Sequence, residues 1–326
     1  MRPFRLGRGP FLVLGRAGLD LYADPPGTRT EEASRFTAAL GGSAANIAAA
    51  IVRLGGAAAL LTAVSDDAVG RFVVNELKRY GIEPKHVRPV GGEARNSLAV
   101  VETRLENCQS VIYRNGAADF ELAETDVARV DFSAFCALIV TGTALAAEPS
   151  RSATFLAIAR AIKSSIPVIL DVDYRPYSWT SAADASSTCR RAADLCNIVI
   201  GNDVEFDVMA GGRGGLDFAR DLSSRLHTVI YKKGEHGSTA FSDGAAFETG
   251  IFRVDALKPT GAGDAFMAGF VTGLSAGLNL QACVLRGSAA AAIVVTRVGC
   301  APASPSAIEL DQFIKNHPGP VPAAEV

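Results

Sequence analysis

The stretch Lys258-Pro-Thr-Gly-Ala-Gly-Asp264-Ala-Phe-Met-Ala-Gly-Phe270 places a glycine-rich turn, a carboxylate and a run of small and apolar residues in direct succession. Gly261 and Gly263 let the backbone approach an anion, and the residues from Ala265 onward predict a helix whose first free amides face the turn. The positive end of such a helix attracts a phosphate. Asp264 is placed to take the proton from a substrate hydroxyl whose oxygen attacks phosphorus. Locally, an ordinary turn followed by an aspartate cap is an equally good interpretation.

The size and composition indicate a globular protein that acts on a small molecule. The chain has 326 residues, of which 48% are hydrophobic, and a formal net charge of -2, so it can bury a sizeable core in one large domain or two average ones. No apolar stretch of membrane-spanning length, secretory signal or basic cluster for nucleic acid is recognisable. The six cysteines show no metal-ligand spacing and predict buried free thiols in the cytoplasm.

Short apolar strands alternate with helices along most of the chain. Strands are expected at 11–14, 58–64, 137–140, 168–171, 198–200 and 228–231, and helices at 44–54, 69–80 and 152–163. This alternation predicts a parallel sheet covered by helices on both faces. Two stretches, 20–40 and 96–113, have strand character without an intervening helix and predict a small antiparallel side sheet. The proline-rich end, 317–326, predicts a disordered tail.

Two further motifs carry groups suited to a polyol or an acid. Gly41 and Gly42 precede a helix, so that the backbone can approach a polyol while Asn46 points its amide back toward the loop; a plain helix start is the alternative. Asp173 and Arg175 follow a buried strand, at the strand end where open sheets bind ligands. Arg175 is suited to grip a carboxylate in two-pronged fashion, unless it forms a surface ion pair with Asp173.

Two other segments indicate a nucleotide with its metal ion. Asn202 and Glu205 lie one helical turn apart after a strand, where they can hold the water shell of magnesium or form a capping box, or both. Lys232, Gly234 and Gly237 follow the next strand and supply positive charge and close backbone for phosphates. An ordinary hairpin turn has the same appearance, and His236 is expected to be a solvated turn residue.

Nearly the whole chain resembles the ribokinase-like, PfkB-type family of carbohydrate kinases. Three separated motifs carry the resemblance: Gly41-Gly42 with Asn46, Asn202-x-x-Glu205 and Thr260-Gly-Ala-Gly-Asp264. It implies an α/β fold in one kinase domain over residues 1–316, with a central mainly parallel sheet between helices. It also implies a small β-sheet lid from about 16–40 and 95–115, ATP as phosphoryl donor and Mg²⁺ as cofactor.

The resemblance also implies roles for individual residues. Asp264 is the expected catalytic base, and the amides of Gly261, Ala262 and Gly263 form an anion hole. The expected ATP site comprises Asn202, Lys232, Gly234, Gly237, Thr260, Gly261, Gly263 and Ser288. Asn202 and Glu205 are the expected metal-associated residues. The expected sugar site comprises Asp20, Gly41, Gly42, Asn46, Arg114, Asp173 and Arg175.

Within the family, the segments 15–27, 111–119 and 171–179 look most like those of kinases that act on keto-deoxy sugar acids, one of them in myo-inositol catabolism. In such kinases the positions of Arg114 and Arg175 hold the carboxylate. A non-catalytic sugar-acid sensor is the alternative from another class, although Asp264 and Glu205, which degenerate kinases lose first, are both present. The open edges of the lid also predict a homodimer through that sheet.

The motif departs from the family's common pattern at one position. Many relatives have an aspartate where this chain has Lys258, and that aspartate helps to bind a monovalent cation beside the anion-hole loop. We expect the ammonium of Lys258 to take the place of this cation, so that potassium is not required. The alternative is that Lys258 points to solvent and Asp255 serves as a displaced cation ligand.

Overall fold

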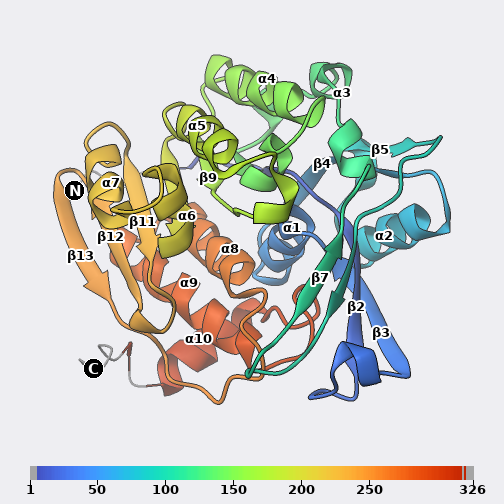
Figure 1. Cartoon of the computed structure of the whole chain (residues 1–326). Coiled ribbons are helices and arrows are strands. Elements are labelled where there is room, and N and C mark those ends of the chain that lie inside the picture. Colours follow the sequence, from blue (N-terminus) through green and yellow to red (C-terminus); the bar gives the residue numbers. More distant parts are fainter. Residues whose placement is uncertain (1–5, 318, 321–326) are drawn as a thin grey trace.

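The computed structural model describes residues 6–317 and 319–320, and a nine-stranded sheet runs through its centre (Figure 1). The strands are β1 Phe11–Leu14, β4 Ala58–Ser65, β5 Val87–Val90, β8 Ala137–Thr141, β9 Val168–Asp171, β10 Ile198–Asn202, β11 Thr228–Lys232, β12 Ser238–Ser242 and β13 Ala245–Thr249. Their order across the sheet is β13-β12-β11-β10-β9-β8-β1-β4-β5. The strands from β11 to β5 in this order are parallel, as the alternation predicted.

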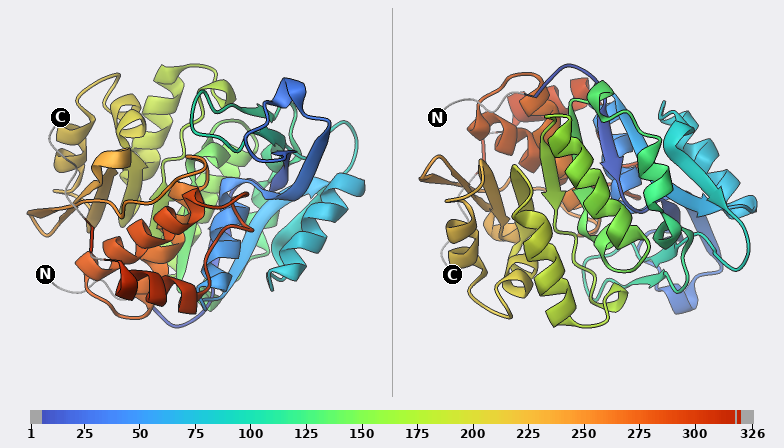
Figure 2. Two further views of the ribbon diagram at one scale, coloured as in Figure 1. Left: turned by 90° about the horizontal axis from the view of Figure 1, so that it is seen from below. Right: turned by 90° about the horizontal axis from the view of Figure 1, so that it is seen from above.

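Helices cover both faces of this sheet (Figure 2). One face packs against α1 Ser43–Arg53, α2 Ala68–Arg79, α8 Ala262–Ser275, α9 Leu280–Val295 and α10 Ala307–Asn316. The other packs against α3 Glu124–Ala128, α4 Ser150–Lys163, α5 Ala182–Ala193, α6 Asp203–Met209 and α7 Gly215–Leu222. Strand β1 is apolar throughout because both of its faces are buried. Phe11 and Val13 enter one core while Leu12 and Leu14 enter the other, because successive side chains point to opposite faces.

The last two strands of the sheet, β12 and β13, are antiparallel, and the sequence prediction did not include them. A turn at Asp243 and Gly244 joins them, with positive φ at both residues (51° and 73°). Asp-Gly is a strong hairpin signal, because this turn needs two residues that tolerate the left-handed region. The signal was therefore present, but the flanking strands are short and mostly small or polar.

The lid is a separate four-stranded sheet in the order β3-β2-β6-β7 (Figure 1). Its strands are β2 Gly18–Asp24, β3 Arg35–Gly41, β6 Leu98–Val101 and β7 Ser110–Tyr113. They coincide with the two stretches that broke the helix–strand alternation, except that β2 begins two residues before the first stretch and β3 ends one residue after it. The two outer pairings are antiparallel as predicted, but β2 pairs with β6 in parallel, so the prediction of an antiparallel side sheet is wrong for the central pair. Phe36 and Tyr113 are exposed on its outer strands, and the homodimer through this sheet stays a prediction.

Three remaining expectations concern the thiols, the tail and the membrane. All six cysteines are free, and all but Cys108 are buried. Most of the predicted tail lies outside the described residues, but His317 stacks on Phe313 with 3.8 Å between ring centroids. None of the helices in the described residues has the length and apolar character to span a bilayer.

Glu102 fastens the two halves of the lid together. Its side chain is buried and accepts hydrogen bonds from the backbone N–H of Thr30 (2.9 Å), from Arg104 Nε (2.7 Å) and from the backbone N–H of Gln109 (3.1 Å). Thr30 lies between β2 and β3, while Gln109 precedes β7. Burial alone would raise the pKa of Glu102, but these hydrogen bonds hold it at about 2. The Glu102 carboxylate thus links the two parts of the lid by hydrogen bonds and remains charged through neutral and mildly acidic pH.

Replacing Glu102 by Gln is expected to loosen the lid selectively, because a charge-assisted hydrogen bond contributes about 1.5–3 kcal/mol. Limited proteolysis between β6 and β7 at neutral pH measures the effect, with Glu106→Gln in the exposed turn as the matched control. Since the folded pKa lies below the ordinary value, the contribution is present above about pH 4.5 and is lost as the pH falls toward 2. Equal cleavage rates in the two variants would contradict this assignment.

Candidate active site

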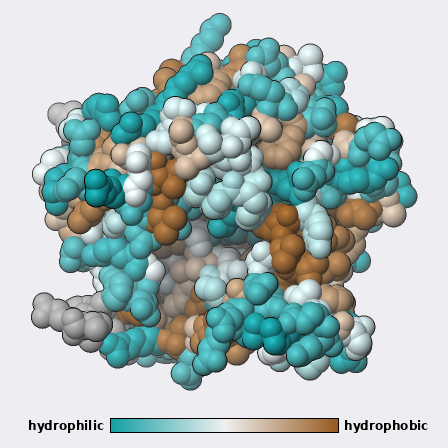
Figure 3. All heavy atoms as spheres, in the orientation of Figure 1, coloured by the Kyte–Doolittle hydropathy of each residue, from teal (hydrophilic) through white to brown (hydrophobic). Residues whose placement is uncertain are grey.

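A cavity of about 1310 Å³ opens between the central sheet, the amino end of α8 and the lid; Figure 3 shows this face hollowed at its centre. Asp171, Asn202 and Lys232 reach it from the carboxyl ends of β9, β10 and β11. Val101 and Ile112 line it from the lid. The cavity thus lies where open parallel sheets bind ligands.

All but two of the residues predicted for the site line this one cavity. They are Asp20, Asn46, Arg114, Asp173, Arg175, Asn202, Glu205, Lys232, Gly234, Gly237, Lys258, Thr260, Gly261, Ala262, Gly263, Asp264 and Ser288. The two exceptions are Gly41 and Gly42. A Cβ at Gly41 would lie 1.9 Å from Asp20 Oδ1, and one at Gly42 would lie 2.4 Å from the carbonyl oxygen of Arg16. The glycine pair makes room for the chain that carries Arg16 and Asp20, and its predicted approach to a polyol stays a prediction.

The first turn of α8 presents the proposed base to the cavity. Gly261 occupies the N-cap position with a φ of 82°, and the helix begins at Ala262, three residues earlier than predicted. Asp264 lies in this first turn, and its Oδ2 accepts a hydrogen bond from Asn46 Nδ2 at 2.9 Å. Since Gly261 holds the cap position, the aspartate-cap interpretation of Asp264 is wrong. The first amides of α8 have no intrahelical partners and remain available to an anion.

The surroundings of Asp264 favour a proton acceptor that works near neutral pH. Burial raises the pKa of Asp264 to about 7, and the negative charge of Asp173 adds to this rise. The Asn46 amide, Arg175 and Lys232 oppose it. A general base works best when its pKa lies near the operating pH, so the carboxyl is suited to that role.

Acidic side chains gather at or just after the carboxyl ends of β9 and β10, where they line the cavity. Burial raises the pKa of Asp171 well above its usual value and also raises the pKa of Glu205, and Asp173 adds to both shifts. Lys232 is the main cation that opposes these shifts. This wall therefore carries excess negative charge that a bound cation would offset.

Asn202 and Glu205 form the capping box considered above. Asn202 Oδ1 accepts from the backbone N–H of Glu205 at 2.9 Å, and Glu205 Oε2 accepts from that of Asn202 at 2.7 Å. Glu205 Oε1 also accepts from the backbone N–H of Tyr174 at 3.2 Å. Within residues 6–317 and 319–320, no three His, Cys, Asp or Glu side chains are grouped so that they could hold a metal ion. This donor set fits a hydrated cation held through water rather than a bare ion in a protein cage.

The segment predicted to bind phosphates, 232–237, forms a hairpin turn, which was the alternative interpretation. Lys232 pairs with Ser238 across β11 and β12, and residues 233–237 form the connection. A Cβ at Gly237 would lie only 2.0 Å from the carbonyl oxygen of Thr249, so this turn requires glycine. A Cβ at Gly263 would lie 3.4 Å from Lys232 Nζ, which places the ammonium beside the first turn of α8.

Two buried acceptor atoms on the sugar side have no hydrogen-bond partner in the described part of the chain. They are Asp20 Oδ1 and Asn46 Oδ1. Asp20 Oδ2 accepts from the Tyr22 hydroxyl at 3.0 Å, so the Asp20 carboxylate is held in place with one oxygen free. Leaving such acceptors unpaired is costly, and hydroxyl groups of a bound polyol would satisfy them.

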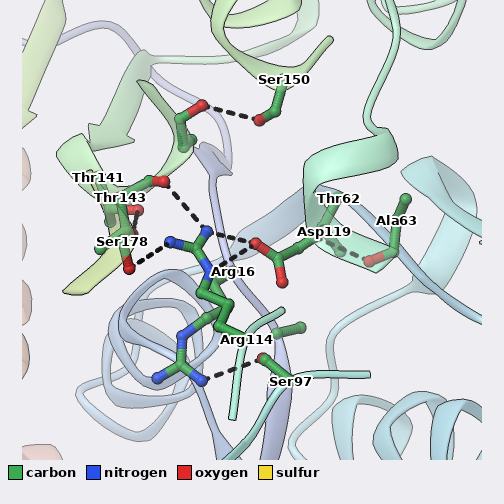
Figure 4. A network of polar contacts seen from close by, with 12 residues as sticks. Arg16, Thr62, Ala63, Ser97, Arg114, Asp119, Thr141, Thr143, Ser150 and Ser178 are labelled. Carbon is green, nitrogen blue, oxygen red and sulfur yellow. Dashed lines mark hydrogen bonds and ion pairs between the residues drawn. The ribbon is translucent and has the colours of Figure 1, made fainter. Parts of the chain in front are cut away.

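Both arginines predicted for the carboxylate already have an aspartate partner. Arg114 Nε donates to Asp119 Oδ2 at 3.1 Å and Arg114 Nη2 donates to Thr143 O at 3.0 Å, as Figure 4 shows. Arg175 pairs with Asp173 at 3.0 Å, which is the ion pair considered as its alternative. The Arg175 side chain is 48% exposed, whereas Asp173 is buried. Each of these guanidinium groups is therefore charge-compensated.

Lys258 is completely buried, and its Nζ donates to the carbonyl oxygen of Thr260 at 2.5 Å. Its burial lowers its pKa, while the charges of Cys300 and Asp264 oppose that shift. The alternative in which Lys258 points to solvent is therefore wrong. The ammonium lies inside the protein, against the backbone of the anion-hole loop.

Sequence reasoning missed several residues of the cavity wall. The main ones are Arg16, Ser43, Thr143, Asp171 and Tyr177. Ser43 and Thr143 donate to Asp173 Oδ2 and hold that acid in a conformation with a positive φ of 37°. Arg16 follows the carboxyl end of β1, so the rule that singled out Asp173 and Asn202 applied to it as well.

The whole sequence was compared with protein families and with known proteins. The family model described as pfkB family carbohydrate kinase matches residues 11–307. A 5-dehydro-2-deoxygluconokinase of Photobacterium profundum is 43% identical over 311 residues, which cover 93% of this chain and 94% of the relative. A 5-dehydro-2-deoxygluconokinase 1 of Bacillus cereus is 36% identical over 322 residues, which cover 96% of each chain.

Among solved structures, a double mutant of fructokinase from Vibrio cholerae superposes with a TM-score of 0.84. The two are 26% identical, and the match covers 95% of this chain and 99% of the fructokinase. That structure holds fructose, ADP and a potassium ion. The likeness extends over the central sheet, the helices and the lid together.

Proposed function

The chain belongs to the pfkB family of carbohydrate kinases, and we propose that it transfers the terminal phosphoryl group of ATP to the primary hydroxyl of 5-dehydro-2-deoxy-D-gluconate. The products are the 6-phosphate and ADP. The observation that carries the proposal is the position of Asp264, which faces the cavity from the first turn of α8 with a pKa of about 7.

In the proposed reaction the substrate hydroxyl gives its proton to the Asp264 carboxylate as its oxygen bonds to the terminal phosphorus. The bond from that phosphorus to the bridging oxygen of ADP breaks, and the electron pair leaves with ADP. The Asn46 amide orients Asp264 through the 2.9 Å hydrogen bond. The free amides of the 261–263 turn and the ammonium of Lys232 stabilise the charge on the moving phosphoryl group.

Mg²⁺ accompanies ATP in this proposal. Asn202 and Glu205 would hold it through its water shell, because their own oxygens already accept backbone hydrogen bonds. Burial raises the pKa values of Asp171 and Glu205, and the charge of Asp173 adds to both shifts; a dication bound nearby would favour the charged carboxylates. When bound, the ion neutralises charge on the phosphates.

The substrate assignment rests on the relatives and on the charge of the pocket. The segments 15–27, 111–119 and 171–179 already favoured 5-dehydro-2-deoxygluconokinase of myo-inositol catabolism, and the relatives named above carry that name. Arg16, which forms no ion pair within the described residues, lines the cavity together with the compensated Arg114 and Arg175, and a neutral sugar has little use for such an uncompensated guanidinium group. A 2-dehydro-3-deoxygluconokinase is the second candidate, because its substrate is also a keto-deoxy sugar acid.

Turnover of a substrate panel tests the assignment. We expect ATP-dependent ADP release with 5-dehydro-2-deoxy-D-gluconate. Its kcat/KM should be at least about tenfold above that with 2-dehydro-3-deoxy-D-gluconate, fructose or ribose. A tenfold ratio corresponds to about 1.4 kcal/mol of additional transition-state stabilisation. Turnover confined to neutral sugars would rule out the sugar-acid kinase. Calorimetric binding of the acid without any phosphorylated product would favour the sensor instead.

Replacing Asp264 by Asn is expected to lower kcat by about 10²- to 10⁴-fold, because the base is lost while the shape is kept. In the unaltered enzyme kcat/KM rises with pH and levels off above about pH 7, since Asp264 accepts a proton only when ionised. Asp217→Asn, on the exposed surface of α7, is the matched control. A kcat unchanged by Asp264→Asn would exclude Asp264 as the base.

We also propose that Lys258 replaces the monovalent cation. The V. cholerae fructokinase structure holds potassium, whereas in this chain the buried ammonium of Lys258 donates a hydrogen bond to the Thr260 carbonyl beside the glycine-rich turn. The ammonium thus neutralises a carbonyl oxygen that a bound cation would otherwise face.

Swapping potassium for sodium in the assay is therefore expected to change kcat by less than about twofold, as a fixed ammonium needs no exchangeable ion. Lys258→Asp restores the acid common in relatives and is expected to lower kcat and to make the remaining activity depend on potassium. Strong activation of the unaltered enzyme by potassium over sodium would refute the replacement.

A further inference from the structure

Arg16, Arg114 and Arg175 line the cavity that also contains the predicted sugar residues Asp20 and Asn46. The three arginines differ in whether a carboxylate compensates their charge. Arg114 contacts the buried carboxylate of Asp119, and Arg175 contacts that of Asp173. Each pair is close to neutral as a unit. A substrate carboxylate that approached either guanidinium would meet the resident aspartate as well, which weakens the attraction.

Arg16 lacks such a partner. The contact that fixes it is neutral: Nη1 donates to Ser97 Oγ at 3.1 Å (Figure 4). No carboxylate forms an ion pair with Arg16 in the described part of the chain, although its charge acts on Asp20. Arg16 is 9% exposed and lines the cavity, so its side chain is nearly withdrawn from bulk water. A charge in that position lacks a close counter-ion until an anion binds.

Contacts with the main domain and with the lid both fix the position of Arg16. The carbonyl oxygen of Arg16 accepts from the backbone N–H of Ala45 in α1 at 3.3 Å, while Ser97 directly precedes lid strand β6. Arg16 thus bridges the central sheet and the lid. A side chain fixed in this way loses little conformational freedom when it binds a ligand.

The charges of all three arginines act on the Tyr177 phenol. Its own burial raises its pKa, and the charges of Arg175, Arg16 and Arg114 oppose that rise. Tyr177 lines the same cavity. Arg16 is therefore on the arginine-rich side where a sugar acid's carboxylate would be taken up.

We infer that Arg16 is the residue by which this pocket distinguishes a sugar acid from a neutral sugar. Its unpaired guanidinium binds the substrate carboxylate, and Arg114 and Arg175 position the surrounding wall through their aspartate partners. This inference rests on the proposed function and names the side chain that sets its substrate class.

A purely structural role for Arg16 predicts a different outcome. Arg16 lowers the pKa of Asp20 against the effect of burial, so its loss would weaken hydroxyl binding by Asp20. That effect acts equally on an acid and on its neutral analogue. The ratio of the two kcat/KM values therefore separates recognition of the carboxylate from support of Asp20.

The experiment compares 5-dehydro-2-deoxy-D-gluconate with its primary amide, which keeps the shape but carries no charge. Arg16→Gln keeps a hydrogen-bond donor for Ser97 and removes the charge. We expect it to lower kcat/KM for the acid about 10- to 100-fold and to change that for the amide less than about threefold. Arg71→Gln on the exposed face of α2 is the matched control and should leave both values unchanged.

Arg16→Lys provides a second variant if the glutamine variant does not fold. It keeps the charge but loses the two-pronged geometry, so the acid-to-amide ratio should fall to an intermediate value. An unchanged ratio in either folded variant would overturn the inference. Failure of the unaltered enzyme to phosphorylate any sugar acid would instead refute the proposed function itself, so the two failures are distinguishable.

Discussion

The hydrogen bond from the Asn46 amide to the Asp264 carboxylate joins the first turns of two helices that lie 218 residues apart in the chain. It depends on α1 and α8 packing side by side on one face of the sheet, in the same core. With that packing, α8 supplies the proposed base and α1 supplies the amide that orients it. Other residues of the cavity come from strand ends, from the lid and from α9, so the cavity forms around this pair of helices.

Charge is distributed unevenly around that junction. Burial, helped by the negative charge of Asp173, keeps the pKa of Asp264 near neutral. Asp171 and Glu205 line the same cavity and add negative charge that cations brought by the nucleotide would offset. Lys232 and Lys258 lie against the anion-hole turn, one beside Gly263 and one on the Thr260 carbonyl. A site that binds polyphosphate needs this arrangement, since positive charge must face the moving group while negative charge holds its metal ion.

The central sheet and the position of Asp264 could be predicted from the sequence, and the features that could not be predicted have physical reasons. The buried parallel strands and the 258–270 motif are local patterns, so they predicted both the sheet and the position of the base. The β12–β13 hairpin was missed because its strands are short and only partly apolar. The close packing of Gly41 and Gly42 against Asp20 and Arg16 was not foreseen, because it depends on tertiary contacts. The partners of Arg114 and Arg175 could not be foreseen either, because which acid compensates which arginine is decided by tertiary contacts.

The central claim is that this site transfers a phosphoryl group to the primary hydroxyl of a keto-deoxy sugar acid. Two-dimensional ³¹P–¹H correlation NMR of the reaction with ATP and 5-dehydro-2-deoxy-D-gluconate tests it most directly. The account predicts one new phosphomonoester, coupled to the methylene protons at C6, formed in step with ADP. ADP without a phosphorylated sugar acid, or a phosphate coupled to any other position, would contradict it.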